Sequence, residues 1–281
     1  MIRISRMSIS DIPFAVKLSA QEKWGTPRSD LARILHLDPH GSFVASEASL
    51  RVGMITTVRF GRDLAWIGNV IVDKNHRGKH IGQSVVAHAV DYLKRIHVKH
   101  IGLYCFRNNV EFYKKLGFVE DAQFVRFRRP RRRSEQVERE SRKGLSLGRL
   151  LSVDREAFGV DRSKVIRSWI AERAGKYFGF GDRKMSAFLL VKKYPTTFDF
   201  GPGVAFGALD DDLRKLLAEA VGYARNKPIE VSCLAQNRNM LRVLREFGFR
   251  TTNRGYRMFW NHSVKLGVDS ANILLGFLDK G

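Results

Sequence analysis

The stretch VIVDKNHRGKHIGQSVVAHAV, residues 70–90, decides how the first half of this chain folds. It begins with apolar residues typical of a buried strand and enters a loop with glycines at positions 78 and 82. From residue 81 the apolar residues recur at helical spacing, on one face of a helix that we expect to end near Ile96. The stretch therefore predicts a strand, a tight loop and an amphipathic helix in direct succession.

The loop between this strand and helix has the chemistry of an anion site. The first amides of a helix lack intrahelical acceptors and carry partial positive charge, so they attract phosphate. Gly78 and Gly82 keep side chains away from that spot, while Arg77, Lys79 and His80 add donors. A P-loop is excluded because no Ser or Thr follows Lys79, and the dinucleotide fingerprint needs a third glycine. We predict a pyrophosphate cradle; a glycine-bearing turn without a ligand stays open as the alternative.

The elements around the loop indicate an α/β fold. Alternating or apolar runs predict strands at 42–48, 51–60, 63–73 and 100–106, followed by a short helix that Gly117 ends. Strand, helix and strand at this spacing require a right-handed crossover between parallel strands. We expect an α/β chain (α+β by some schemes) with a mixed central sheet flanked by helices.

One phrase occurs twice, as FYKKLGF at 112–118 and as VLREFGF at 243–249. The order strand, helix, strand over 196–260 resembles the order over 63–128, although we expect a strand before the helices that follow residue 145. The second half therefore appears as a divergent copy of the first.

Length and composition favour two domains. The chain has 281 residues, six arginines lie between Arg126 and Arg133, and apolar residues nearly vanish from there to Leu145. We expect a first domain at 1–128, a basic linker or hairpin at 129–144, and a second domain at 145–281.

The chain is strongly basic. Lysine and arginine number 50 against 28 acidic residues, which gives a formal net charge of +22 and attracts polyanions. The run Arg126–Arg133 is either a solvated linker or an arm that binds nucleic acid. We do not favour nucleic acid, because the chain shows neither an aromatic-rich single-strand platform nor a recognition-helix signature.

Cysteine and hydropathy patterns exclude several classes of protein. Only Cys105 and Cys233 occur, without His or Cys at metal-ligand spacing, so we expect two small buried residues, no disulfide framework and no metal site. No apolar run approaches the ~20 residues that span a bilayer, and the start MIRISRMSISDIPF is unlike a signal peptide. We expect a soluble, cytoplasmic protein with no membrane partner.

The first half resembles the GCN5-related N-acetyltransferases, the GNAT superfamily. The strand NVIVD, the loop RGKHIG, the helix behind it, the next strand and FYKKLGF follow that family's order over about residues 1–128. Arg77 and Gly82 match the motif Arg/Gln-x-x-Gly-x-Gly/Ala, and His80 replaces its first glycine. SVDREAFGVDR (152–162), FDFGPGV (198–204) and GYRMFW are similar to the C-terminal domain of a subgroup that carries a second, degenerate acetyltransferase-like domain.

The resemblance implies acetyl-CoA (coenzyme A) as the cofactor and direct transfer of its acetyl group to an amine. The main chain of Val70, Ile71 and Val72 would meet the thioester carbonyl. The pyrophosphate would lie on the loop and first helical turn, formed by Arg77, Gly78, Lys79, His80, Ile81, Gly82 and Gln83. The family's asparagine after the next strand is out of register: Phe106 takes its place, and Asn108 is the candidate for that contact.

For catalysis the resemblance points to Tyr113 as the acid that protonates the departing thiolate. The alternative is an aromatic residue that only packs where a helix meets a strand; the second copy has Leu244 at the matching place. No general base is specified. Glu22, Glu47 and Asp63 lie on elements that could reach the pocket, but an exposed carboxylate is the favoured interpretation for each, and an amine delivered through ordered water needs no base.

The acceptor is expected to be a small-molecule or peptide amine, and the oligomeric state stays open. We predict one acetyl-CoA per chain, because the second half lacks the loop and places Asp210, Asp211 and Asp212 where phosphate would lie. The alternative function is an acyl-CoA-sensing or nucleic-acid-binding protein on the same scaffold, without turnover.

Overall fold

The computed structural model describes residues 1–131, 144–172, 175–181, 186–224, 227–276 and 278–281. The chain forms two compact units. Unit 1 comprises Met1–Val119, Met258–Val264 and Leu278–Gly281; unit 2 comprises Glu120–Arg257 and Lys265–Phe277. The first unit thus ends earlier than the expected position 128, and two segments from late in the sequence return to it.

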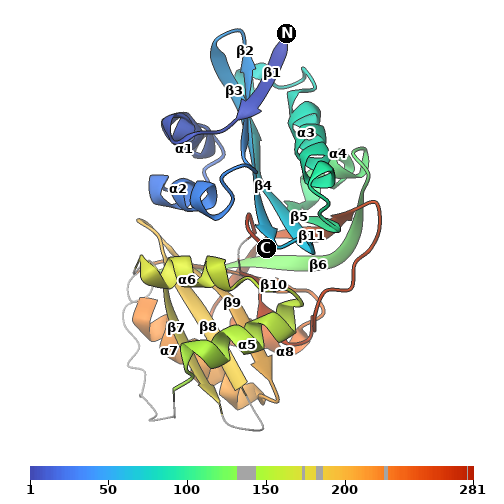
Figure 1. Ribbon diagram of the computed structural model, residues 1–281. Helices are drawn as coiled ribbons and strands as arrows, with labels where there is room; N and C mark the ends of the chain where they lie inside the picture. The colour runs from blue at the N-terminus through green and yellow to red at the C-terminus, as the bar shows by residue number, and fades with distance from the viewer. Residues whose placement is uncertain (132–143, 173–174, 182–185, 225–226, 277) are drawn as a thin grey trace. The chain divides into compact units, whose positions relative to one another are not determined.

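Unit 1 is a mixed sheet covered by helices on both faces (Figure 1). Helices α1 (Ile12–Gln21) and α2 (Arg28–Leu37) lie on one face, and α3 (Ile81–Arg95) and α4 (Val110–Lys114) lie on the other. In pairing order the strands are β1 (Ile2–Arg6), β2 (Phe43–Glu47), β3 (Leu50–Phe60), β4 (Leu64–Val72) and β5 (His100–Phe106), then the end of β11 (Arg250–Trp260). Pairs from β1 to β4 are antiparallel, and β4 and β5 are parallel.

The predicted crossover is confirmed in β4, α3 and β5. The apolar face of α3 is buried against the sheet through Ile81, Val85, Val86, Ala89, Val90 and Leu93. Removing these side chains from water is the main favourable term that fixes the helix on β3 and β4. The end of β4 and the start of α3 are thereby held next to each other.

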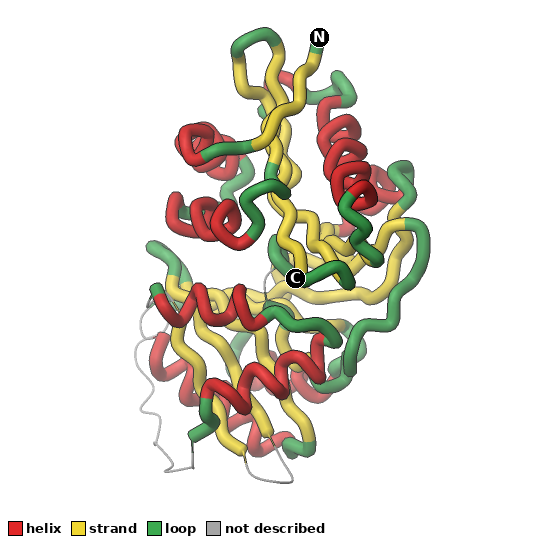
Figure 2. Tube along the Cα trace, viewed as in Figure 1, coloured by secondary structure: helices red, strands yellow, loops and turns green. Residues whose placement is uncertain are grey.

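Unit 2 has the same plan, as the tube in Figure 2 shows by secondary structure. Helices α5 (Leu147–Phe158) and α6 (Ser163–Ala171) lie on one face of its sheet, with α7 (Asp210–Ala224) and α8 (Arg238–Glu246) on the other. In pairing order the strands are β11, β6 (Phe118–Arg129), β10 (Ile229–Leu234), β9 (Phe198–Phe206), β8 (Ser186–Lys193) and β7 (Gly175–Gly181), with β12 (Asn272–Leu274) on β9. β9 and β10 are parallel and joined by α7, as β4 and β5 are by α3. The second half is a divergent copy of the first.

Some elements of unit 2 differ from expectation. The strand expected after residue 145 is absent from the described residues there, because Ser146 caps α5 by accepting a hydrogen bond from the Arg149 amide at 3.3 Å. β7 was not anticipated, since its sequence GKYFGFG alternates glycine with larger residues and glycine weakens a strand pattern. β12 has only three residues, too few to give a pattern.

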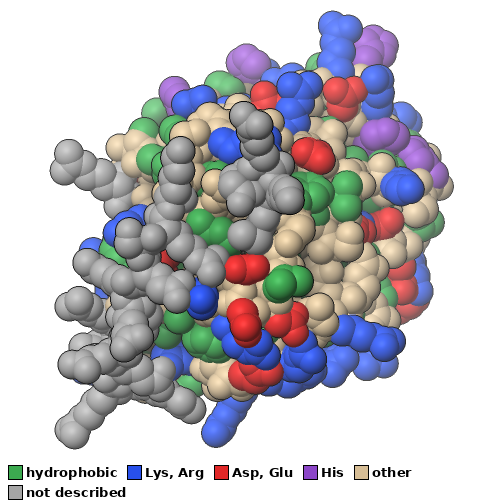
Figure 3. All heavy atoms as spheres, turned by 90° about the horizontal axis from the view of Figure 1, so that it is seen from below, with side chains coloured by type: hydrophobic (Ala, Val, Ile, Leu, Met, Phe, Trp, Pro, Cys, Tyr) green, Lys and Arg blue, Asp and Glu red, His purple; other side chains and the backbone are tan. Residues whose placement is uncertain are grey.

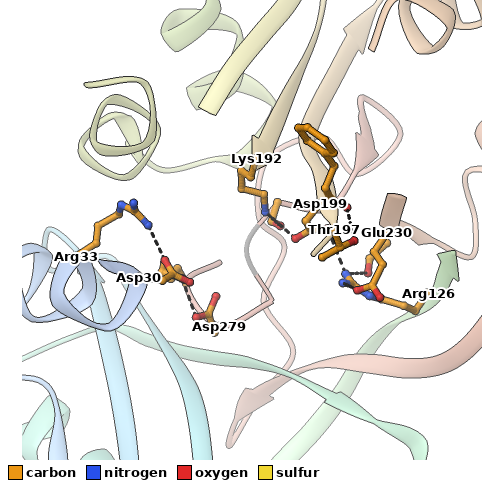
Figure 4. Close-up of polar contacts among 12 residues, drawn as sticks. Asp30, Arg33, Arg126, Lys192, Thr197, Asp199, Glu230 and Asp279 are labelled. Carbon is orange, nitrogen blue, oxygen red and sulfur yellow. Dashed lines mark hydrogen bonds and ion pairs between the residues drawn. The ribbon is translucent and has the colours of Figure 1, made fainter. Parts of the chain in front are cut away.

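The arginine run is partly folded into the sheet. Arg126, Arg128 and Arg129 belong to β6, while residues 132–143 of the expected linker lie outside the described residues. Burial opposes the charge of Arg126, but Asp199 and Glu230 (2.6 Å) outweigh it and raise the pKa of the guanidinium (Figure 4). Arg129 is buried and donates to the Phe247 carbonyl at 2.8 Å. These two arginines are therefore structural.

The two cysteines and the hydropathy of the helices were also used to exclude classes of protein. Cys105 and Cys233 are both buried and unbridged, as expected, and burial raises the pKa of the Cys233 thiol. Within the described residues, no helix combines the length and the apolar character needed to cross a bilayer.

Candidate active site

A β-bulge in β4 shapes the site. Met54 of β3 pairs with Ile71, but Thr56, two residues on, pairs with Gly68, three residues back, so β4 carries one extra residue. The strain lies at Asn69, whose φ of 49° is left-handed, a region that asparagine enters more readily than most residues. Asn69 Nδ2 donates to Thr56 Oγ1 at 3.1 Å and ties the bulge to β3. The bulge redirects the main chain from Val70 onward.

The bulge follows the point where β4 and β5 stop pairing. Their parallel ladder runs from Leu64–His100 to Ile67–Leu103, and the described residues contain no later pair between these strands. Beyond that point β4 and β5 diverge from the ladder, which leaves main-chain groups of β4 without a pair on β5. They can bond to a ligand instead.

The loop after β4 presents a run of unused amides. A 3-10 turn, η2 (Lys74–His76), leads to His80, which precedes α3 in the left-handed conformation (φ 58°, ψ 13°). The first amide with a helical acceptor is that of Ser84, which donates to the His80 carbonyl at 3.0 Å. In the described chain the amides of residues 77–83 donate to no acceptor. Amides without an acceptor before and at a helix N-terminus are the donors that a phosphate group needs.

The cations of the loop pair with neighbouring carboxylates. Arg77 pairs with Glu22 and also donates from Nε to the Val72 carbonyl at 3.2 Å. Lys79 Nζ lies 3.0 Å from Glu47, and this hydrogen bond lowers the pKa of the Glu47 carboxyl. Both pairs are exposed, so each is weak and a phosphate group can compete for the cation.

The carboxylates considered as bases are all ion-paired. Besides Glu22 and Glu47, Asp63 accepts from Lys99 at 2.7 Å, which lowers the pKa of its carboxyl. A carboxylate with a lowered pKa is a weaker base. Glu47 and Asp63 are therefore weaker bases than free carboxylates, and Glu22 is engaged by Arg77.

Helix α4 meets the loop at Gly82. A Cβ at Gly82 would lie 3.4 Å from Phe112 Cζ and 3.7 Å from Val72 Cγ2, so the end of β4, the start of α3 and α4 converge there. Tyr113, which follows Phe112 in α4, is 8% exposed and packs edge-on against Phe112 and Phe118. Burial raises its pKa, which keeps the hydroxyl protonated at neutral pH. Tyr113 thus both packs at this junction and keeps its hydroxyl proton.

The other predicted residues lie at the end of β4, in the loop before α3 and in the turn after β5. Val70 and Val72 are half-buried, Ile71 is buried, and Gly78 adopts a left-handed φ of 80° with open space around it. Asn108 lies exposed in the 3-10 turn η3 (Arg107–Asn109) at the end of β5.

Two features of the site escaped the sequence reasoning. Asn69 is a polar residue inside an apolar strand, and this was the one available signal for the bulge. Asp279 lies beside it, with Oδ2 3.2 Å from Asn69 Nδ2, although the two are 210 positions apart. No sequence pattern links such positions.

The corresponding place in unit 2 begins with the same bulge. Leu189 pairs with Gly203 and Val191 with Phe200, so β9 also carries one extra residue. Its left-handed residue is Gly201 (φ 129°), and the residue after it is Pro202, which has no N–H. Unit 2 therefore lacks the amide that Val70 supplies in unit 1.

Unit 2 also fills this place with its own chain. β12 pairs with β9 through Asn272–Val204 and Leu274–Gly203, and the Leu275 amide donates to the Ser232 carbonyl of β10 at 2.8 Å. The segment thus lies between the two parallel strands. Helix α7 then begins with three acidic residues rather than a basic loop.

Comparisons with known proteins agree with this architecture. The family model described as Acetyltransferase (GNAT) family matches residues 11–118, and the Acetyltransferase (GNAT) domain model matches residues 150–268. No curated protein matches the sequence significantly.

Three solved structures share the fold over nearly the whole chain. A protein from Pyrococcus horikoshii assigned as an acetyltransferase has 22% identity and a TM-score of 0.79, covering 100% of this chain and 96% of its own. A GCN5-related N-acetyltransferase from Sphaerobacter thermophilus has 15% identity and a TM-score of 0.67, with 95% and 98% covered. A tandem GNAT protein from the clavulanic acid biosynthesis pathway has 12% identity and a TM-score of 0.67, with 94% and 100% covered.

These identities show the fold alone, while the family models cover both halves of the chain. The fold is mixed α/β, with a parallel crossover in each half. The chain belongs to the GNAT superfamily: it is an N-acetyltransferase built from two acetyltransferase-like domains, and its chemistry is acyl transfer from an acyl-CoA.

Proposed function

We propose that unit 1 binds acetyl-CoA and transfers its acetyl group directly to an amine. The observation that supports this most is the run of free amides at residues 77–83, directly after the bulged end of β4. A pyrophosphate needs such donors, and the short spacing to Val70 suits a donor that carries a thioester at its other end. Acetyl-CoA supplies an activated acyl group when bound.

The residues of unit 1 divide this work. The amides of Arg77, Gly78, Lys79, His80, Ile81, Gly82 and Gln83 would hold the phosphates, and the main chain of Val70–Val72 would polarise the carbonyl. Asn108 would bond the donor near the end of β5. Tyr113 would give its proton to the departing thiolate, since its raised pKa keeps the hydroxyl protonated at neutral pH.

The experiment that tests this proposal measures donor binding to the full chain. Acetyl-CoA at about 100 times its Kd should raise the free energy of unfolding by about 2.7 kcal/mol and raise Tm accordingly. Gly82→Leu should abolish that shift, because a Cβ at Gly82 already contacts Phe112 and Val72, and a larger side chain would displace the first turn of α3 and its amides.

Ala87→Leu is the matched control, an exposed position on the same helix with the same added side chain. It should respond to acetyl-CoA as the parent does. Equal stabilisation of the Gly82→Leu variant would show that the donor binds elsewhere.

A further inference from the structure

Residues 278–281, which we term the 278–281 segment, pack against β4 inside unit 1. The fully buried Trp66 donates from Nε1 to the Leu278 carbonyl at 3.3 Å. A Cβ added at Gly68 would overlap the main chain of Asp279, so glycine is needed there for the segment to approach. The segment is therefore seated on the strand directly before the bulge.

A buried ion pair anchors this segment. Lys280 is 0% exposed, and its Nζ donates to Asp30 of α2 at 3.1 Å and to Asp279 at 2.7 Å. Asp30 also accepts from Arg33 at 2.6 Å, and Figure 4 shows Arg33, Asp30 and Asp279 in a row. A buried lysine so paired holds its carboxylate partners in fixed positions.

The Asp279 carboxylate is thereby placed at the bulge and partly open to solvent. Its side chain is 27% exposed, and its Oδ2 accepts from Asn69 Nδ2 at 3.2 Å. The amide of Val70 is the next along the chain. Among the described residues, Asp279 is the carboxylate that accepts a hydrogen bond from Asn69 of the bulge.

Asp279 lies on the α2 side of the sheet, which favours the acceptor rather than acetyl-CoA as the substrate that it meets. The free amides lie at the start of α3, whereas the anchor Asp30 lies on α2, on the opposite face (Figure 1). A donor bound on the α3 side leaves the α2 side for the acceptor, since attack on a carbonyl comes from a direction that the donor does not occupy.

We propose that Asp279 binds the acceptor as a primary alkylammonium ion beside the bulge, and that Lys280 is the residue that positions it. This inference rests on the proposed function, because it names the acceptor class of the same site. A carboxylate favours cationic amines over neutral ones and orients the nitrogen toward the carbonyl.

The transfer itself balances without another reactant. The bound ammonium loses a proton to solvent, its nitrogen forms the C–N bond, and the C–S bond to coenzyme A breaks. The second proton lost by the nitrogen replaces the one that Tyr113 gives to the thiolate. The products are the amide, free coenzyme A thiol and one proton.

The test follows thiol release by the full chain with acetyl-CoA and three amines. Cadaverine and butylamine are cationic at pH 8, whereas aniline is neutral. Asp279→Asn should raise KM for cadaverine and butylamine at least tenfold, with kcat changed less than threefold and acetyl-CoA binding unchanged. Asp279→Glu should recover part of the loss, and KM for aniline should not change.

Two further variants separate positioning from packing. Lys280→Met keeps the volume but removes the anchor, so it should raise KM for the cationic amines as Asp279→Asn does. Asp91→Asn, which removes one exposed carboxylate from α3, is the matched control and should leave KM unchanged.

Several results would overturn the inference. Unchanged KM in Asp279→Asn would do so, as would thiol release that none of the alkylamines accelerates although acetyl-CoA stabilises the protein. Higher turnover in Lys280→Met would show that the segment blocks the acceptor instead. If Asp279→Asn does not fold, the salt dependence of the parent protein replaces this test. The KM of the parent for cadaverine should rise with salt concentration while its KM for aniline stays constant, and equal salt dependence would overturn the inference. A parent that acetyl-CoA does not stabilise would refute the proposed function itself.

Discussion

Tyr113 combines a buried aromatic ring with a hydroxyl that can donate a proton. Because burial raises its pKa, it stays protonated at neutral and mildly alkaline pH. We predict that Tyr113→Phe lowers kcat by about 100-fold, since only the step that protonates the thiolate loses its donor.

Calorimetry should give an unchanged Kd for acetyl-CoA in this variant. In the parent, ionisation of Tyr113 should not reduce kcat until well above pH 10, because the deprotonated form appears only near the raised pKa. Parent-like kcat in Tyr113→Phe would assign the residue to packing alone.

The left-handed backbone conformation of His80 should lower the stability of the protein by a measurable amount. It stands in the left-handed region, where a side chain costs about 1 kcal/mol relative to glycine, and its ring bonds to the half-buried Gln83 at 2.8 Å. We predict that His80→Gly raises the free energy of unfolding by about 1 kcal/mol in urea melts and retains acetyl-CoA binding.

Gly78→Ala is the counterpart of this change. Gly78 has a φ of 80° with open space around it, so alanine adds strain without a clash and should lower stability by about 1 kcal/mol. If His80→Gly lowered the free energy of unfolding as Gly78→Ala does, the assignment of strain to His80 would be wrong.

Among elements, those with strong periodicity were predictable and those defined by long-range pairing were not. The α3 helix and its crossover followed from apolar spacing and glycine placement, because one buried face requires that pattern. The 278–281 segment and β12 could not be predicted. Their positions depend on packing partners such as Gly68 and Ser232, which are distant in sequence.

The elements of unit 2 bear on stoichiometry. β12 lies between β9 and β10, Pro202 removes the bulge amide, and α7 begins with three acids. A pyrophosphate and a thioester would each lack donors there. We predict one acetyl-CoA per chain, and calorimetric titration that found two sites would contradict this.

For the whole molecule, the net charge of +22 combines exposed cations with cations that are paired inside the fold. Buried pairs such as Arg162–Asp154 and Lys192–Asp199, both at 2.9 Å, hold cations inside the fold. On the face in Figure 3, acidic side chains lie among Lys and Arg, apart from what the undescribed residues cover.

The path of the whole chain makes unit 1 depend on residues far from its own half. Met258 Sδ lies 3.4 Å from Cys105 Sγ, fully buried Phe259 packs edge-on against Trp66, and Lys280 holds Asp30. A fragment ending at residue 133 loses all three. Exposing Trp66 alone forfeits about 2 kcal/mol of apolar burial, and Asp30 loses a buried partner, which costs about 3 kcal/mol or more.

We therefore predict that this fragment shows no cooperative thermal transition and no stabilisation by acetyl-CoA. Fusing residues 258–281 to it through a long flexible linker is the matched control and should restore part of both, because the missing strand end and ion pair return at high effective concentration. Differential scanning calorimetry with and without acetyl-CoA checks the pair. A bare fragment that melts near the Tm of the parent would mean that the first domain folds without residues 258–281. The boundary predicted at residue 128 would then describe unit 1 better than the contacts do.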